Sequence, residues 1–280
     1  MQHTYFVIPD FVNEISTQSI LSIRLATDGF SFCIHDSRGQ LVAFIHEPLD
    51  AENQVISLYQ LQEYIKKYPL LNLQYAKVFL MPCTREKLLV PDAFYNEHAA
   101  MTFYSITQDT HTDDHFLHHH IESLKANLVT TFPESIITFI LSHFPQTHII
   151  NSAYPFLVES LSRNEEIPPQ LFVAIEHQYF DILVMNNKQP VLFNTFDYKN
   201  NTDILYHVLN CIQTLEIDSQ KVQLTLTGNS PQDALYQLLK RYIPNSRIKV
   251  NDRTLNTILN DNSLYYSSFY HLLNLHLCEL

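Results

Sequence analysis

Glycine is scarce in this chain of 280 residues, which has only Gly29, Gly39 and Gly228. Loops that hold phosphate groups depend on glycine, because phosphate oxygens approach the main chain closely there. Walker-type and dinucleotide-binding loops both need clusters of this residue. The scarcity therefore argues against either kind of loop.

Positive charge is also in short supply, with 17 Lys and Arg against 29 Asp and Glu and a net charge of -12. Nucleic acids and anionic bilayers attract clustered basic residues, so we expect no nucleic-acid partner. No apolar run is long enough to span a bilayer, and no basic leader precedes the first apolar run. We therefore expect no membrane insertion and a cytoplasmic location.

Cysteine pairs at metal-binding spacing are missing as well. The four cysteines lie far apart without a C-x-x-C motif, which favours buried, reduced thiols: Cys33, Cys83, Cys211 and Cys278. No nucleophile-elbow motif is present. Tryptophan is absent, whereas 16 Tyr and 18 Phe indicate large aromatic cores.

Residues 20–47 contain three β-rich runs, separated by Asp28-Gly29 and by residues 36–39. Asp-Gly between such runs predicts a two-residue hairpin turn, and the segment is expected to be an antiparallel meander. An apolar stripe then predicts a helix over 55–68, ended by Pro69. A buried strand is expected at 76–81. The order is βββαβ.

The same order returns roughly 150 residues later. Strands are predicted at 171–177, 180–185 and 190–196, followed by a helix at 203–215 with Asn201-Thr202 as its caps. A further strand at 221–227 ends at Gly228. Two matching runs predict a duplicated α/β fold.

The segment between the two runs is expected to complete the first half. It predicts a helix at 92–103, two strands within 116–132, a helix at 134–143, a strand at 147–151 and a helix at 154–161. Helices at 232–242 and 264–277 and a strand at 247–250 follow the second run. A polar linker ends at Pro168-Pro169. We therefore place the first half, with its inserted strands and helices, at 1–165 and the second at 166–280.

Residues 111–120 hold five histidines and two aspartates. Imidazole and carboxylate groups are zinc ligands. In a strand, however, His118 and His120 would lie on one face and His115 and His119 on the other. Because no face gathers four ligands, we predict a polar, partly exposed strand. A metal-dependent protein that uses this cluster stays as an alternative.

Two βββαβ halves joined by a crossover resemble the actin-like superfamily, which includes sugar kinases, seventy-kilodalton chaperones and cytoplasmic pilus-assembly proteins. More narrowly, the chain resembles an uncharacterised bacterial family of actin-like-fold proteins, with a domain of unknown function. Residues 87–91 (KLLVP) ahead of Tyr95-Asn96-Glu97, and the ending HLLNLHLCE at 271–279, carry this narrower match. The resemblance implies a duplicated actin-like (ribonuclease H-like) fold, with a cleft between its halves.

In active members of the superfamily, two glycine-bearing hairpins hold the phosphates of ATP, and aspartates hold its Mg²⁺. At the first such pattern, Arg24 takes the acidic position and Ala26 the glycine. At the second pattern, Ala174 replaces the aspartate, and residues 176–178 (EHQ) replace the glycine run. A negative side chain at Glu176 would repel phosphate.

Four residues remain as candidates for a vestigial nucleotide site: Asp28, Asp181, Gly228 and Asn229. Gly228 and Asn229 stand where the superfamily has its adenosine-facing Gly-Gly. The leading hypothesis is therefore a non-catalytic, actin-like binding or scaffolding protein with an unidentified protein partner and no cofactor. The alternative is a divergent ATP-binding protein, an ATPase or phosphotransferase, that uses Asp28, Asp181 or Glu176. The resemblance also allows a homo-oligomer.

Overall fold

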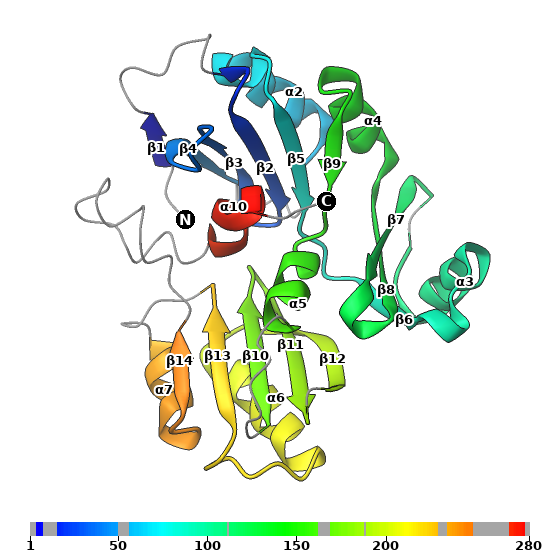
Figure 1. The fold of residues 1–280 in the computed structure, drawn as a ribbon, viewed down its shortest axis with the longest axis vertical. Coiled ribbons are helices and arrows are strands. Elements are labelled where there is room, and N and C mark those ends of the chain that lie inside the picture. Colours follow the sequence, from blue (N-terminus) through cyan, green and yellow to red (C-terminus); the bar gives the residue numbers. More distant parts are fainter. Residues whose placement is uncertain are drawn as a thin grey trace. The chain divides into compact units, whose positions relative to one another are not determined.

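The computed structural model describes residues 4–7, 16–49, 56–110, 112–161, 169–187, 189–228, 234–248 and 269–277 (Figure 1). The chain divides into two compact units. The first comprises residues 1–120, 127–155 and 271–280, and the second comprises 121–126 and 156–270. The predicted boundary after residue 165 falls in a segment, 162–168, that lies outside the described residues, and it stays a prediction.

The first unit is built on a six-stranded sheet with the order β1-β4-β3-β2-β5-β9. Strands β2, β5 and β9 run parallel, whereas β3 and β4 form the antiparallel meander with β2. The strands predicted from residue 20 onward are confirmed with small changes at their ends, whereas β1 was not predicted. Their bounds are β1 Thr4–Val7, β2 Ile20–Ala26, β3 Gly29–His35, β4 Leu41–Pro48, β5 Lys77–Pro82 and β9 Thr147–Ile149.

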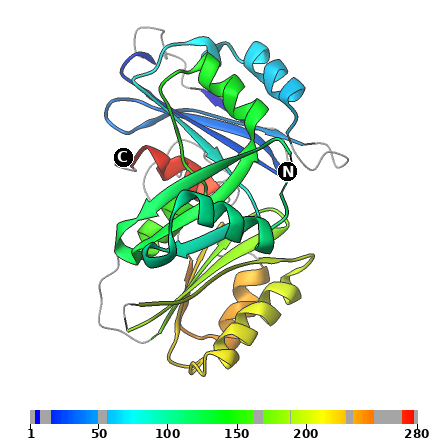
Figure 2. The ribbon, with the colours of Figure 1, turned by 90° about the vertical axis from the view of Figure 1, so that its right-hand side faces the viewer.

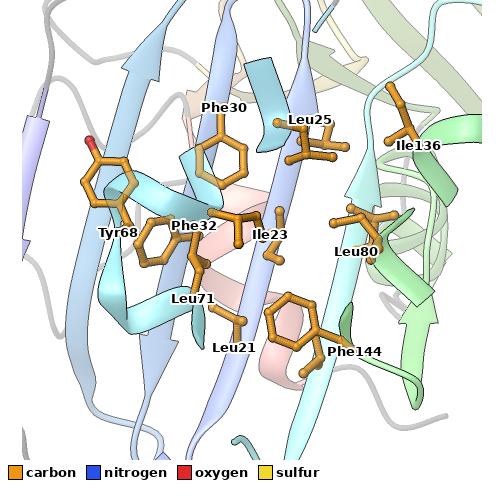
Figure 3. Close-up of a cluster of buried hydrophobic side chains, with 14 of the residues drawn as sticks. Leu21, Ile23, Leu25, Phe30, Phe32, Tyr68, Leu71, Leu80, Ile136 and Phe144 are labelled. Carbon is orange, nitrogen blue, oxygen red and sulfur yellow. The ribbon is translucent and has the colours of Figure 1, made fainter. Parts of the chain in front are cut away.

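One face of this sheet carries the main core of the first unit (Figure 3). Ile23, Phe32 and Leu80 are fully buried there. Helices α2 (Leu58–Lys67) and α4 (Glu134–His143) lie side by side (Figure 2), and η1 (Pro69–Asn72) follows α2. A capping box of Ser57 and Gln60 starts α2, which satisfies main-chain donors at its first turn. The core thus sits between this face and its helices.

The opposite face of the sheet carries polar side chains and is covered in part by the C-terminal segment. Helix α10 (Tyr270–Asn274) and the turn η5 (Leu275–Leu277) belong to the predicted terminal helix, whose first part lies outside the described residues. The Cys33 thiol donates to the Leu272 carbonyl oxygen at 3.6 Å. The rings of His35 and His276 stack with centroids 3.8 Å apart. Residues 271–277 therefore pack on β3.

The strands inserted between β5 and β9 form a smaller sheet with the order β6-β8-β7. Tyr104 is fully buried against it, and its hydroxyl lies 3.2 Å from Thr131 Oγ1. The predicted helix at 92–103 starts later, because Asn96 caps it and residues 92–94 form a separate turn. The elements are β6 Lys87–Pro91, η2 Asp92–Phe94, α3 Glu97–Thr107, β7 Asp114–Ile121, η3 Glu122–Leu124, β8 Ala126–Pro133 and α5 Ala153–Leu161.

The second unit repeats the first, with the strand order β12-β11-β10-β13-β14 corresponding to β4-β3-β2-β5-β9. Parallel and antiparallel pairs also correspond, which confirms the predicted duplication. Helix α6 is capped by Asn200, one residue before the predicted caps, and packs beside α7 (Figure 2). The elements are β10 Gln170–Ile175, β11 Tyr179–Asn186, β12 Gln189–Asp197, α6 Asn201–Thr214, β13 Gln223–Thr227, α7 Ala234–Tyr242 and β14 Ser246–Ile248.

Helix length and hydropathy also bear on the membrane prediction. Among the helices in the described residues, none combines the length and apolar character that a bilayer span requires.

The stacked histidines predict that acid destabilises the first unit. Burial, with a smaller contribution from His276, lowers the pKa of His35 from 6.5 to about 3. The unfolded chain therefore binds the proton first, so this contribution to stability is present above pH 6.5 and is lost as pH falls. At pH 5 we expect a loss of roughly 2 kcal/mol from this group. Urea unfolding at pH 7 and pH 5 measures it.

The variant His35→Gln is the control for this prediction. It should flatten the dependence of unfolding free energy on pH, whatever it does to stability at pH 7. An equal dependence in both proteins would contradict the assignment to His35.

Candidate functional site

The first hairpin joins β2 to β3, and its interior holds a buried ion pair. Arg24 Nη1 lies 2.6 Å from Asp28 Oδ1, and the two side chains are only 3% and 4% exposed. Arg24 comes from β2 and Asp28 from the turn. The Asp28 carboxylate is therefore committed to an arginine of its own hairpin.

The turn itself differs from the prediction by one residue. Ala26 pairs with Gly29, so Thr27 and Asp28 form the turn and Gly29 begins β3. Gly29 has φ +147°, and a Cβ there would overlap the Glu47 carbonyl oxygen. The close approach of β4 thus accounts for this glycine without a phosphate ligand.

A second polar pair lies beside Arg24 on the same face of the sheet. Ser31 stands opposite Arg24 in the register, and His46 stands opposite Ser31. A hydrogen bond joins Ser31 Oγ and His46 Nδ1 at 2.8 Å, and both residues are fully buried. Burial lowers the pKa of His46 to about 4, against the opposing effect of Asp28. His46 is therefore neutral near pH 7.

The hairpin of the second unit, between β10 and β11, has a corresponding row of residues. Ala174 stands opposite Asp181, which stands opposite Thr195. Asp181 is 2% exposed, and Thr195 Oγ1 donates to its Oδ1 at 2.7 Å. Thus Ala174, Asp181 and Thr195 match Arg24, Ser31 and His46 position for position. Asp181 stands opposite Ala174, the residue that the resemblance aligns with the superfamily's aspartate.

The main chain of the second hairpin is held by Tyr198, which follows β12. The Tyr198 hydroxyl donates to the Glu176 carbonyl oxygen at 2.7 Å, and its N–H donates to the Gln178 carbonyl oxygen at 3.0 Å. Gln178 adopts a left-handed conformation with φ +73°. These contacts fix the hairpin by side-chain and main-chain bonds from the same unit.

The third pattern, at the end of β13, is only partly described. Gly228 has φ +80°, and a Cβ there would overlap the Ile175 carbonyl oxygen. The close approach to β10 accounts for this glycine. Asn229 lies outside the described residues.

The histidine cluster follows the predicted alternation along β7. His115 Nδ1 lies 2.5 Å from Glu134 Oε2, and His119 Nε2 lies 2.8 Å from the Ile149 carbonyl oxygen. On the other face, His120 Nε2 lies 3.1 Å from Asp92 Oδ2, and His118 contacts the ring of Tyr95. His111 lies outside the described residues.

No three His, Cys, Asp or Glu side chains of the described residues gather as a metal site would need.

Sequence reasoning missed Ser31, His46, Thr195 and Tyr198. The signal for the first three was the strand register, which sets Ser31 opposite Arg24, His46 opposite Ser31 and Thr195 opposite Asp181. Tyr198 gave no such signal, because its contact depends on the path of the chain after β12.

Both units thus show the topology of an actin-like fold, and comparison with solved structures agrees. A protein of unknown function with an actin-like ATPase fold from Bacteroides thetaiotaomicron VPI-5482 matches with a TM-score of 0.79 and 21% identity. The match covers 97% of this chain and 100% of that one. The PilM-PilN type IV pilus biogenesis complex matches with a TM-score of 0.59 and 10% identity, over 94% of this chain and 100% of that one.

The protein therefore has an actin-like ATPase fold. Residues 9–246 match the family described as "Protein of unknown function (DUF3822)", and the chain belongs to this family. Comparison with curated protein sequences gave no match.

The Arg24–Asp28 pair yields a stability prediction. In Arg24→Ala the Asp28 carboxylate stays buried without its arginine, and we expect a loss of about 3–5 kcal/mol. The double variant Arg24→Ala/Asp28→Ala should lose much less than the sum of the two single variants. Urea unfolding of the four proteins at pH 7 gives the coupling free energy. Additive losses would contradict the energetic role of the pair.

Proposed function

We propose that this protein is a non-catalytic actin-like protein that acts in the cytoplasm as a binding or scaffolding module, with a degenerate nucleotide site. The observation that carries this proposal is Arg24. It occupies the position where the superfamily has an acidic residue, and it pairs with Asp28 inside the hairpin. A Mg²⁺ ion near this hairpin would meet a guanidinium in place of an acceptor oxygen.

The second unit supports the same conclusion by a different route. Ala174 offers no ligand atom, and the Asp181 carboxylate accepts a hydrogen bond from Thr195. Glu176 stands at the end of the hairpin, where a phosphate would meet a like charge. Both hairpins therefore oppose the Mg²⁺–phosphate chemistry that the fold performs elsewhere.

A role in binding other proteins is supported by the surface of the inserted sheet. Helix α3 and the preceding turn expose Phe94, Phe103 and Ile106, at 67%, 43% and 77%. Phe103 and Ile106 are three residues apart and so share one face of α3, and adjacent exposed apolar side chains mark sites of protein interaction. A pilus protein of the same fold is known in complex with a partner. The three buried cysteines among the described residues, Cys33, Cys83 and Cys211, suit the reducing cytoplasm.

An ATP-binding protein is the second candidate function, because Asp181 is a buried carboxylate opposite Ala174, the residue that the resemblance aligns with the superfamily's aspartate. In that case Asp28, Asp181 or Glu176 would carry the acid–base or metal role.

Thermal melting with millimolar ATP–Mg²⁺ separates the two functions. A ligand at one hundred times its dissociation constant adds about 2.7 kcal/mol to stability. We expect no rise in Tm for the wild-type protein and no heat of binding by calorimetry. A rise that the variant Asp181→Asn abolishes would instead establish the ATP-binding function and overturn the degenerate site.

A further inference from the structure

A cavity of about 270 Å³ opens on the second unit where β12 ends and α6 begins. We call it the notch. Three rings and two carboxylates dominate its lining, together with one ammonium group: Tyr198, Tyr206, His207, Asp197, Asp203 and Lys199. The volume suits one large side chain better than a nucleotide, since pockets for small molecules are typically about 300–1,000 Å³.

The rings of the notch are held in place by their neighbours. His207 stacks on Phe196, with centroids 4.4 Å apart and planes 19° apart. Tyr206 meets His207 edge-on at 5.3 Å and is 64% exposed. Tyr198 is fixed by its hydrogen bond to Glu176. The notch therefore offers an exposed aromatic surface on a rigid support.

Negative charge prevails in the notch. Asp203 Oδ2 accepts the N–H groups of Lys199 at 2.8 Å and Asn200 at 3.2 Å. These main-chain bonds hold the pKa of Asp203 below its usual value, so its carboxylate stays ionised. Asn200 in turn accepts the N–H groups of Thr202 and Asp203. Two donors at the start of α6 are thus engaged within the protein, which disfavours an anionic ligand.

A cation suits the notch best, because two carboxylates outnumber the single ammonium of Lys199 and the ring of Tyr206 can stack on a cation. Among cationic side chains, the planar guanidinium of arginine both stacks on an aromatic ring and binds a carboxylate in bidentate fashion. The net charge of -12 also favours a basic partner.

Strand β12 leads into the notch and lies at the edge of its sheet. Within the described residues it pairs only with β11, so its outer edge presents main-chain N–H and C=O groups on alternate residues, except that the Thr195 N–H donates to Asn194 Oδ1 at 2.8 Å. Pro190 removes a donor near its start, whereas residues 192–197 contain no proline. An extended segment that pairs with this part of β12 would end at the notch.

We propose that the notch and the outer edge of β12 bind an extended segment of a partner protein, with an arginine side chain of that segment seated against Tyr206 and beside the carboxylates. This inference rests on the proposed function, because it supplies the partner-binding surface of a scaffolding protein. It uses residues of the second unit alone.

The test uses a fluorescein-labelled peptide, Thr-Val-Thr-Val-Arg-Thr, whose binding to the full-length protein is followed by fluorescence anisotropy. Two matched peptides replace the arginine by citrulline, its neutral isostere, or by glutamate. We expect the arginine peptide to bind in the micromolar to millimolar range. The citrulline peptide should bind about three- to thirtyfold more weakly, and the glutamate peptide more weakly still.

Protein variants locate the site. Tyr206→Ala removes an exposed ring and should weaken binding of the arginine peptide by a similar factor. Asp197→Asn should reduce the preference for arginine over citrulline. Tyr59→Ala is the matched control, because Tyr59 is 71% exposed on α2 in the first unit, and it should bind as the wild-type protein does.

Three outcomes would overturn the proposal: no binding of the arginine peptide at millimolar protein, equal binding of the citrulline peptide, or binding that Tyr206→Ala leaves unchanged. Tighter binding of the glutamate peptide would assign the notch to an anion through Lys199 and would also overturn it. The melting experiment with ATP–Mg²⁺ does not depend on any of these outcomes, so it tests the proposed function independently of the notch.

Discussion

The Arg24 guanidinium and the Asp28 carboxylate are both almost fully buried at the turn of the first hairpin, 2.6 Å apart. Charges leave water at a high cost, and each is tolerated there because the other is present. Their neighbour His46 is kept neutral by the same burial. The chemistry available at this end of the sheet depends on the pair, because Arg24 holds the Asp28 carboxylate. A ligand that needs Asp28 must first separate it from Arg24.

The two units retain the same framework but differ in what it holds. In each, three residues stand in a row, across β2, β3 and β4 or across β10, β11 and β12, and a hydrogen bond joins the last two: Ser31 with His46, and Asp181 with Thr195. Only the first unit places a charge at the head of the row, since Ala174 stands where Arg24 stands in the other. The duplication therefore preserves register, which the sheet requires, while the side chains at its polar end have diverged.

Sequence patterns predicted the elements well because burial imposes periodicity. The helix at 134–143 and the two βββαβ runs follow directly from apolar spacing. The contacts at the hairpins were harder to predict. Placing the first turn at Asp28-Gly29 would set Arg24 opposite Cys33, whereas the observed turn at Thr27-Asp28 sets it opposite Ser31. After this shift of the turn by one residue, each side chain stays on the same face of the sheet, but every residue has a different partner on the neighbouring strand. The candidate site is defined by which residues face one another across neighbouring strands. Apolar periodicity does not fix those pairings, so it did not reveal the site.

The glycines show why a motif must be judged by its surroundings. The resemblance to the actin-like superfamily aligns Gly228, and the segment just before Gly29, with nucleotide contacts, yet each glycine has a carbonyl oxygen, of Glu47 or Ile175, where a Cβ would lie. Backbone packing within one unit is sufficient reason for both. A ligand site needs further groups that point to the ligand, and at the hairpins these groups bond to one another. On the second unit, the rings and carboxylates of the notch face solvent in part, and this is where the chain offers groups to a partner.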